Sequence, residues 1–422
     1  MEKFLRTVKT LIPRWLFSAI QPLYHYFLAG IGALWYRFPS RALYVVGITG
    51  TKGKTSVTEL VAAILEEAGH RVALANTSRF KIAEKSERNL TRHSMLGRAR
   101  LQRFLRGAVD AKCEYAVIEM TSEGARQFRH AFIDMDALIF TNLSPEHIES
   151  HGSYEKYVEA KMGIARTLER GDAHKHTIVA NCDDAEAPRF LSVRVGEKYS
   201  YGIADAEPYA TGAEGGTMLW RGMTIRLRLP GEFNIRNALA AAAFAESRGI
   251  QREVIREALE KFTLMPGRME RVDEGQNFSV LVDYAHTADS LERAYGAYAG
   301  IKKICILGGT GGGRDKAKRK SMGKIADTHC AHIILTTEDP YDEDPEDIAN
   351  DVAEGIQKCS HEYIPDRREA MRKAFRLAEK GAAVFITGKG TDPCIMGPKG
   401  TRIPWSDADV AREELVALLH GE

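Results

Sequence analysis

Residues 47–56 read Gly47-Ile-Thr-Gly-Thr-Lys-Gly-Lys-Thr-Ser56, and an apolar run, Leu43–Val46, comes directly before them. A helical pattern, Val57–Ala68, follows. A strand, a glycine-rich loop and a helix in this order are the setting of a phosphate-binding loop. Its glycines let backbone N–H groups surround phosphate oxygens, and the helix N-terminus favours negative charge. The sequence therefore predicts an α/β domain of the P-loop ATPase type.

The loop supplies the predicted contacts to the nucleotide. We expect Lys54 to reach the terminal phosphates and the Thr55 hydroxyl to bind magnesium. The glycine spacing departs from the strict pattern, because Ile48 stands at the first glycine position. A glycine-rich turn without a ligand is the alternative, which the flanking strand and helix disfavour. The predicted nucleotide-binding residues of the loop are Gly50, Thr51, Lys52, Gly53, Lys54, Thr55 and Ser56.

Composition sets limits on the class of protein. A chain of 422 residues has room for two or three domains, and 44% hydrophobic with 27% charged residues is typical of a soluble globular protein. The formal net charge of +2 calls for no nucleic-acid partner. The six cysteines show no metal-site spacing. They favour a reducing, cytoplasmic location and argue against a disulfide framework or a zinc knuckle.

The N-terminal segment, residues 1–40, is apolar. Trp15–Tyr36 contains no Asp, Glu, Lys or Arg and is long enough to cross a bilayer. Polar residues within it argue against spanning, and Pro22 is expected to break or kink a helix, which would leave two short apolar helices. We expect a helical hairpin that packs on the protein or lies on a membrane surface, so that residues 1–40 make peripheral membrane contact.

Two further buried strands end in polar groups. Ala116–Met120 carries Glu119 near its end, and Ala137–Phe140 runs into Thr141-Asn-Leu-Ser-Pro-Glu-His147. Ligands of parallel sheets gather at the carboxyl ends of the strands. Each side chain alone reads as an ordinary strand-end carboxylate or a capping histidine. Together, after a phosphate-binding loop, Glu119 and His147 are candidate magnesium ligands.

Five blocks of sequence, in order, resemble the Mur ligases, the ATP-dependent amide-forming enzymes of peptidoglycan precursor synthesis. The likeness is greatest to the branch that adds the third residue of the stem peptide. The blocks are Thr49-Gly-Thr-Lys-Gly-Lys-Thr55, Ile118-Glu-Met-Thr-Ser122, Thr141–His147 with His151, Glu159-Ala-Lys161, and Phe233-Asn-Ile-Arg-Asn237.

The resemblance implies roles that residue spacing does not give. Glu119 and His147 are implied to hold one magnesium ion with Thr55. A carbamylated Lys161 is implied to hold a second, and Asn237 to contact the base. The implied catalytic residues are Lys54, Lys161, His147 and Arg268. The implied substrate contacts are Thr121, Ser122, His286, Asp339, Tyr341, Gly388 and Asp392.

In the C-terminal half, the block Met265-Pro-Gly-Arg-Met-Glu270 resembles the family's hinge, with Arg268 directed at the ATP phosphates. Asp283, at a strand end, is implied to bind the ribose. The turn Gly308–Lys316 is on its own a weak dinucleotide fingerprint, and the resemblance assigns it to a Rossmann-like domain. Alternating strands and helices predict parallel sheets throughout. We expect three parts: an apolar helical segment 1–40, an ATP-binding domain 41–265 and a Rossmann-like domain 266–422.

Two motifs depart from the family pattern. Glu338-Asp-Pro-Tyr341 stands where the branch that uses diaminopimelate has Asp-Asn-Pro-Arg, and Gly388-Lys-Gly-Thr-Asp392 where it has Gly-Lys-Gly-His-Glu. Diaminopimelate is therefore a doubtful substrate, and lysine or another amino acid stays open. The roughly 40 residues before the phosphate loop's strand are too few for the family's UDP-binding domain.

The resemblance implies a two-step reaction of a monomeric enzyme with ATP and two magnesium ions. A carboxylate of a UDP-N-acetylmuramoyl-dipeptide-like substrate becomes an acyl phosphate, which the amine of a free amino acid then attacks. Two alternatives stay open. One is another amide ligase on the same scaffold, such as a folylpolyglutamate-type synthetase. The other is a non-catalytic, membrane-associated ATP-binding partner.

Overall fold

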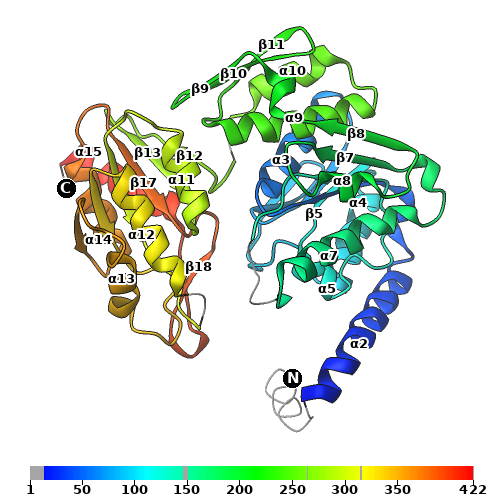
Figure 1. Ribbon diagram of the computed structural model, residues 1–422, viewed down its shortest axis with the longest axis horizontal. Helices are drawn as coiled ribbons and strands as arrows, with labels where there is room; N and C mark the ends of the chain where they lie inside the picture. The colour runs from blue at the N-terminus through cyan, green and yellow to red at the C-terminus, as the bar shows by residue number, and fades with distance from the viewer. Residues whose placement is uncertain (1–13, 146–150, 264, 314–315, 422) are drawn as a thin grey trace. The chain divides into compact units, whose positions relative to one another are not determined.

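The computed structural model describes residues 14–145, 151–263, 265–313 and 316–421, with the side chains of residues 14–20 left aside. The chain forms two compact units (Figure 1). Unit 1 comprises Met1–Asn89, His93–Asp205 and Arg236–Leu259. Unit 2 comprises Leu90–Arg92, Ala206–Ile235 and Glu260–Glu422.

In the described part of the N-terminal segment, from residue 14 on, one continuous α-helix, α2 (Arg14–Trp35), contains Pro22. The expectation that Pro22 would divide the segment into two helices is therefore wrong. Proline removes one backbone donor, and a helix of 22 residues keeps its hydrogen bonds on either side of that gap. Within the described part of the chain, no helix is both long and apolar enough to cross a membrane.

Unit 1 is built on an eight-stranded sheet in the order β4-β3-β2-β5-β1-β6-β7-β8. The six strands from β2 to β8 in this order are parallel, and β3 and β4 form an antiparallel edge. Central β1 is flanked by β5 and β6, so the ends of these three strands lie together. The strands are β1 (Tyr44–Thr49), β2 (Val72–Ala75), β3 (Arg79–Ile82), β4 (Lys85–Arg88), β5 (Tyr115–Glu119), β6 (Ala137–Phe140), β7 (Thr177–Asn181) and β8 (Glu197–Tyr201).

Helices cover this sheet and bury its apolar side chains. Phe140 of β6 stacks on Phe190 with ring centroids 3.9 Å apart, inside a core that includes Ile118 and Leu138. The helices with residues in unit 1 are α2, α3 (Lys54–Glu67), α4 (Arg98–Asp110), α5 (Ser122–Arg126), α7 (Tyr154–Ala165), α8 (Ala187–Leu191), α9 (Glu232–Ser247) and α10 (Arg252–Lys261), with 3₁₀ turns η1 (Pro39–Ala42), η2 (Arg166–Glu169), η3 (Ala173–Lys175) and η4 (Ile203–Ala206).

Unit 2 has a six-stranded sheet in the order β12-β13-β17-β14-β15-β16, parallel except for edge strand β12. Its strands are β12 (Glu270–Val272), β13 (Ser279–Asp283), β14 (Lys303–Leu307), β15 (His332–Leu335), β16 (Ser360–Tyr363) and β17 (Ala383–Thr387). Its helices are α11 (Ala288–Gly296), α12 (Ala317–His329), α13 (Pro345–Ala353), α14 (Arg367–Leu377) and α15 (Asp407–His420), with η5 (Pro398–Gly400).

Two small antiparallel sheets in unit 2 show that parallel pairing does not hold throughout the chain. One contains β9 (Tyr209–Gly212), β10 (Gly215–Trp220) and β11 (Met223–Leu227), and the other contains β18 (Cys394–Met396) and β19 (Arg402–Pro404). The strands of the first are joined by two-residue turns, and a parallel connection needs a much longer crossover.

The structure also contains one disulfide, Cys305–Cys330, which the argument against a disulfide framework did not foresee. Cys305 lies in β14, and Cys330 follows helix α12. The strand-helix crossover brings together two cysteines that are 25 residues apart in sequence. Spacing alone carries no signal for such a pair.

A buried ion pair joins two helices of unit 2. Arg367, at the start of α14, donates to both carboxylate oxygens of Asp407, over 2.8 and 2.7 Å, and to the carbonyl of Thr387 over 2.7 Å. Asp407 begins α15, and its side chain is fully buried. Breaking such a pair from one side leaves an uncompensated charge in the interior.

We predict that Asp407→Asn lowers the free energy of unfolding of unit 2 by about 3–5 kcal/mol, because Arg367 would keep its charge without its partner. Urea titration followed by circular dichroism measures this change. Glu413→Gln is the matched control, since Glu413 pairs with Arg368 at the surface and its removal should cost about 1 kcal/mol or less. Equal losses in the two variants would contradict the assignment.

Candidate active site

The phosphate-binding loop follows β1 as predicted, and two of its glycines are required by geometry. Gly50 has φ +150° and Gly53 has φ +83°. A Cβ on Gly53 would lie 2.5 Å from Oδ1 of Asn237 in α9, and a Cβ on Gly50 would overlap the Thr141 hydroxyl. The predicted base contact Asn237 therefore lies directly against the loop, and only glycine fits at either position.

The segment after β6 holds the loop in place. The Lys52 N–H donates to Oδ1 of Asn142 over 2.9 Å, and the Thr51 N–H donates to the Asn142 carbonyl over 2.7 Å. The Thr141 hydroxyl donates to the Lys52 carbonyl over 2.7 Å. Because β1 and β6 pair in parallel, their carboxyl ends place these groups side by side. Ser56 is buried in the first turn of α3.

Glu119 and Thr55, two of the predicted magnesium ligands, are in direct contact. The Thr55 hydroxyl donates to Oε2 of Glu119 over 3.0 Å, and the Lys54 ammonium lies 3.9 Å from Oε1. The same Oε2 accepts from the Thr77 N–H and hydroxyl, at 3.0 and 2.9 Å. Glu119 is only 2% exposed. A buried carboxylate beside hydroxyls, at the phosphate end of the loop, fits the hard oxygen ligands that magnesium takes together with phosphates.

Lys161 is 1% exposed and reaches the loop from α7. Its ammonium donates to the Gly50 carbonyl over 2.7 Å and lies 5.0 Å from the ring centroid of Tyr157. The Tyr157 hydroxyl is in turn 2.9 Å from the Thr51 hydroxyl. Lys161 is therefore not the surface lysine that its helical context indicates, because its side chain lies at the phosphate loop.

Other predicted residues of unit 1 lie around this centre. His147 falls in the stretch 146–150, outside the described residues. Nε2 of His151 is 3.1 Å from the hydroxyl of buried Ser122. Thr121 caps α5, and its hydroxyl accepts from the Gly124 N–H over 3.0 Å.

In unit 2, the predicted residues near the hinge form a second group. Asp283 accepts from the N–H groups of Ala285 and Met269, both over 2.7 Å, so its carboxylate ties β13 to the hinge. The Arg268 guanidinium lies 4.7 Å above the ring centroid of Tyr284, and Nδ1 of His286 is 2.8 Å from the Tyr284 carbonyl. Burial raises the pKa of Tyr284.

Two acids and two bases form a cluster at the two motifs, 338–341 and 388–392, that depart from the family pattern. Asp339 accepts from Lys389 over 2.8 Å and from Arg92 over 2.7 Å. Asp392 accepts from the same two cations, over 3.2 and 3.3 Å. Burial lowers the pKa of Arg92, but the Asp339 and Asp392 carboxylates outweigh it and raise the pKa overall. The cluster therefore places two fixed cations beside two acids that the sequence singled out.

Tyr341, Glu338 and Gly388 lie next to this cluster in sequence, and each is held by backbone conformation or by close contacts. Tyr341 has φ +54°, and its N–H donates to the Met396 carbonyl over 3.1 Å. Glu338 is buried and accepts from the Thr310 hydroxyl over 3.0 Å, and burial raises the pKa of its carboxyl group. Gly388 has φ +102°, and a Cβ there would overlap Oε2 of Glu338.

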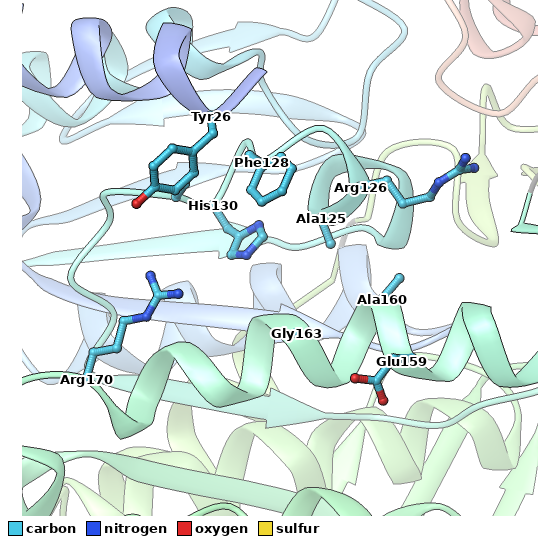
Figure 2. A pocket seen from close by; sticks show the side chains of 10 residues that line it. Tyr26, Ala125, Arg126, Phe128, His130, Glu159, Ala160, Gly163 and Arg170 are labelled. Carbon is cyan, nitrogen blue, oxygen red and sulfur yellow. The ribbon is translucent and has the colours of Figure 1, made fainter. Parts of the chain in front are cut away.

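A separate cavity of about 280 Å³ lies in unit 1 between α2, α5 and α7 (Figure 2). Phe128, His130 and Arg170 turn toward it, with Tyr26 of α2 on its wall. Burial and the Arg170 charge lower the pKa of His130 to about 4. None of the predicted site residues lines this cavity.

Sequence reasoning missed four residues that touch the predicted site. Thr77 and Tyr157 lie outside the glycine-rich and strand-end patterns, and the non-glycine Arg92 carries a φ of +57° in a loop. Of these four, only Lys389 could have been found from the sequence, because it lies between two glycines in Gly388-Lys-Gly390.

Comparison with known proteins agrees with this geometry. Residues 48–245 match the Mur ligase middle domain, and residues 267–390 match the Mur ligase glutamate ligase domain. A UDP-N-acetylmuramyl-tripeptide synthetase of Roseiflexus sp. (strain RS-1) is 37% identical over 421 residues, which cover 93% of this chain and 82% of that protein.

Solved structures show the same fold. A structure of a UDP-N-acetylmuramoyl-L-alanyl-D-glutamate–2,6-diaminopimelate ligase matches with a TM-score of 0.63 and 28% identity, covering 90% of this chain and 79% of that one. A Mycobacterium tuberculosis folylpolyglutamate synthase, at 15% identity, has a TM-score of 0.69 over 94% and 95% of the two chains and shares the fold. The chain belongs to the Mur ligase family of ATP-dependent, ADP-forming ligases.

Proposed function

We propose that this enzyme joins a free amino acid to the terminal carboxylate of a UDP-N-acetylmuramoyl dipeptide. The observation that carries the proposal is the buried contact of Thr55 with Glu119 beside the phosphate loop, with Lys161 at the Gly50 carbonyl. The named tripeptide synthetase and its 37% identity support the choice of substrate. The enzyme is proposed to act as a cytoplasmic monomer whose residues 1–40 touch the membrane surface.

The chain's own residues perform the first step by position and charge. The substrate carboxylate attacks the γ-phosphorus of ATP, the bond to the β–γ bridging oxygen breaks, and ADP leaves. Lys54 is proposed to offset the charge of the transferring phosphoryl group, and the loop N–H groups are proposed to hold the phosphates. Thr55 and Glu119, with the proposed ligand His147, would hold a magnesium ion, which supplies further charge neutralisation when bound.

In the second step, the amine of the amino acid attacks the acyl carbon and loses a proton, and inorganic phosphate leaves. Arg268 is the proposed cation for the ATP phosphates, Asp283 the proposed ribose contact and Asn237 the proposed base contact. The Lys161 ammonium is proposed to lose a proton, and the neutral amine then attacks carbon dioxide and releases a second proton, which leaves a carbamate. The resulting anion would replace a cation at the Gly50 carbonyl and give a second magnesium ion an oxygen ligand.

The identity of the amino acid is proposed from the acid–base cluster. Arg92 and Lys389 are the cations at this place, since Tyr341 replaces the motif arginine. We propose that Arg92 binds the carboxylate of the incoming amino acid and that Asp392 receives its ammonium group. Diaminopimelate is then a poor substrate, because the arginine that is implied to bind its distal carboxylate in the family is missing here.

Phosphate release on addition of UDP-N-acetylmuramoyl dipeptide and a panel of amino acids tests the proposed reaction. We expect release only when both substrates and ATP are present, with lysine or another amino acid faster than diaminopimelate. Release with a folyl glutamate acceptor instead would identify the alternative ligase. A chain that binds ATP but releases no phosphate with any pair would be a binding partner.

We predict that Lys54→Ala slows phosphate release by about 100- to 1000-fold without changing the fold, because one preorganised charge at the phosphates is lost. Turnover and circular dichroism measure the two effects. Lys175→Ala is the matched control, since the Lys175 side chain is 80% exposed and pairs with Asp172 at the surface. Normal turnover of Lys54→Ala would contradict its assignment.

We predict that Arg92→Ala raises the KM for the amino acid by at least about tenfold and leaves the KM for ATP within twofold, because a charge-assisted contact of this kind contributes roughly 1.5–3 kcal/mol. Initial rates at varied amino acid and varied ATP separate the two constants. Arg402→Ala, an exposed arginine of the same unit, should change neither. Equal increases in both KM values would assign Arg92 a structural role only.

A further inference from the structure

One face of α2 exposes a row of large apolar side chains. Leu23, Phe27, Ile31, Leu34 and Trp35 recur at helical spacing and are 72, 68, 47, 69 and 79% exposed. Of the thirteen large hydrophobic residues exposed within the described chain, seven lie on this helix. Such a concentration marks an interaction surface, since exposed apolar residues are usually scattered. We call these five residues the α2 stripe.

The opposite face of α2 is fixed to the body of unit 1. Ala29 and Ala33 are buried, and Gly32 lies so close to Ala99 of α4 that a Cβ would come within 3.2 Å of its Cα. Tyr26 packs on Phe132 with ring centroids 4.8 Å apart. Because small residues hold the helix against the body, the α2 stripe faces outward in the folded unit.

The sequence around α2 is basic. From Lys3 to Thr58 there is no Asp or Glu, and residues 1–41 contain six Lys or Arg and one Glu. These residues carry a net charge of +5, while the whole chain carries +2, so the remainder carries −3. Arg100 and Arg103 of the neighbouring helix α4 are exposed, and Arg170 turns into the cavity beside Tyr26 (Figure 2).

We propose that the α2 stripe inserts into the surface of an anionic phospholipid bilayer, with the surrounding basic residues on the headgroups. The proposal deepens the peripheral membrane contact proposed above. An interfacial helix combines a Trp, Phe and Leu face with Lys and Arg, and the apolar area and the attraction to anionic lipid add together. Burying the stripe in the acyl boundary removes its apolar surface from water while Arg37 stays at the headgroups.

A bilayer fits this surface better than a second copy of the chain. A dimer through the α2 stripe would bring two segments of net charge +5 together, and like charges across an interface oppose association. An anionic lipid surface instead attracts each juxtamembrane Lys or Arg. Charge complementarity therefore favours an anionic lipid surface over a second copy of the chain as the partner of the α2 stripe.

Sedimentation of the full chain with vesicles tests the proposal without substrates. We expect binding to phosphatidylcholine mixed with phosphatidylglycerol, and binding at least about tenfold weaker to phosphatidylcholine alone, since each basic residue near an anionic surface adds attraction. High salt should weaken the binding to the mixed vesicles, because salt screens this attraction. Equal binding to both vesicles would overturn the choice of an anionic lipid.

The variant F27E/L34E places two charges on the exposed stripe, where folding does not depend on the original side chains. We expect its bound-to-free ratio on mixed vesicles to fall at least about tenfold, because apolar burial at these positions is lost. L377E/L419E, at exposed apolar positions of unit 2, is the matched control and should bind as the natural chain does. Unchanged binding by F27E/L34E would overturn the role of the stripe.

Phosphate release in the absence of vesicles separates this inference from the proposed catalysis. F27E/L34E should keep the natural rate there, since α2 contributes no residue to the proposed active site. An inactive natural chain that still binds vesicles would overturn the proposed reaction and leave the membrane surface standing. A concentration-dependent dimer that F27E/L34E abolishes, with no vesicle binding, would show that a second copy covers the stripe.

Discussion

The parallel pairing of β1 with β5 on one side and β6 on the other is the constraint on which the active site depends. It places Glu119, at the end of β5, and Asn142, after β6, on either side of the phosphate loop. The loop is thus held by hydrogen bonds from one neighbouring strand and faces a carboxylate from the other. Without this order of strands, the glycine-rich loop would lack both its support from Asn142 and its contact with the Glu119 carboxylate.

The second shared constraint is burial. Glu119 and Lys161 are 2% and 1% exposed, and a charge in such surroundings requires partners. Glu119 has two hydroxyls, one N–H and the Lys54 ammonium close by, and Lys161 has the Gly50 carbonyl and the Tyr157 ring. Glu119 and Lys161 are therefore part of the packing of unit 1.

Local pattern was enough to predict much of this arrangement. The phosphate loop and the strand ends at Glu119 and Phe140 follow from the order of apolar runs and glycines. Contacts made by residues far apart in sequence were not predictable in the same way. Thr77 and Arg92 meet their partners only through the tertiary fold, and the single helix α2 formed despite Pro22, because its other hydrogen bonds outweigh one missing donor.

The overlap between Gly388 and Glu338 has an evolutionary consequence. Glycine is required at position 388 because the Glu338 carboxyl group leaves no room for a Cβ. The presence of this glycine therefore gives no information about the substrate. Positions 338 and 388 should therefore vary together among homologues. A relative with a short side chain at 338 is free to carry alanine at 388, provided that its backbone there leaves the left-handed region.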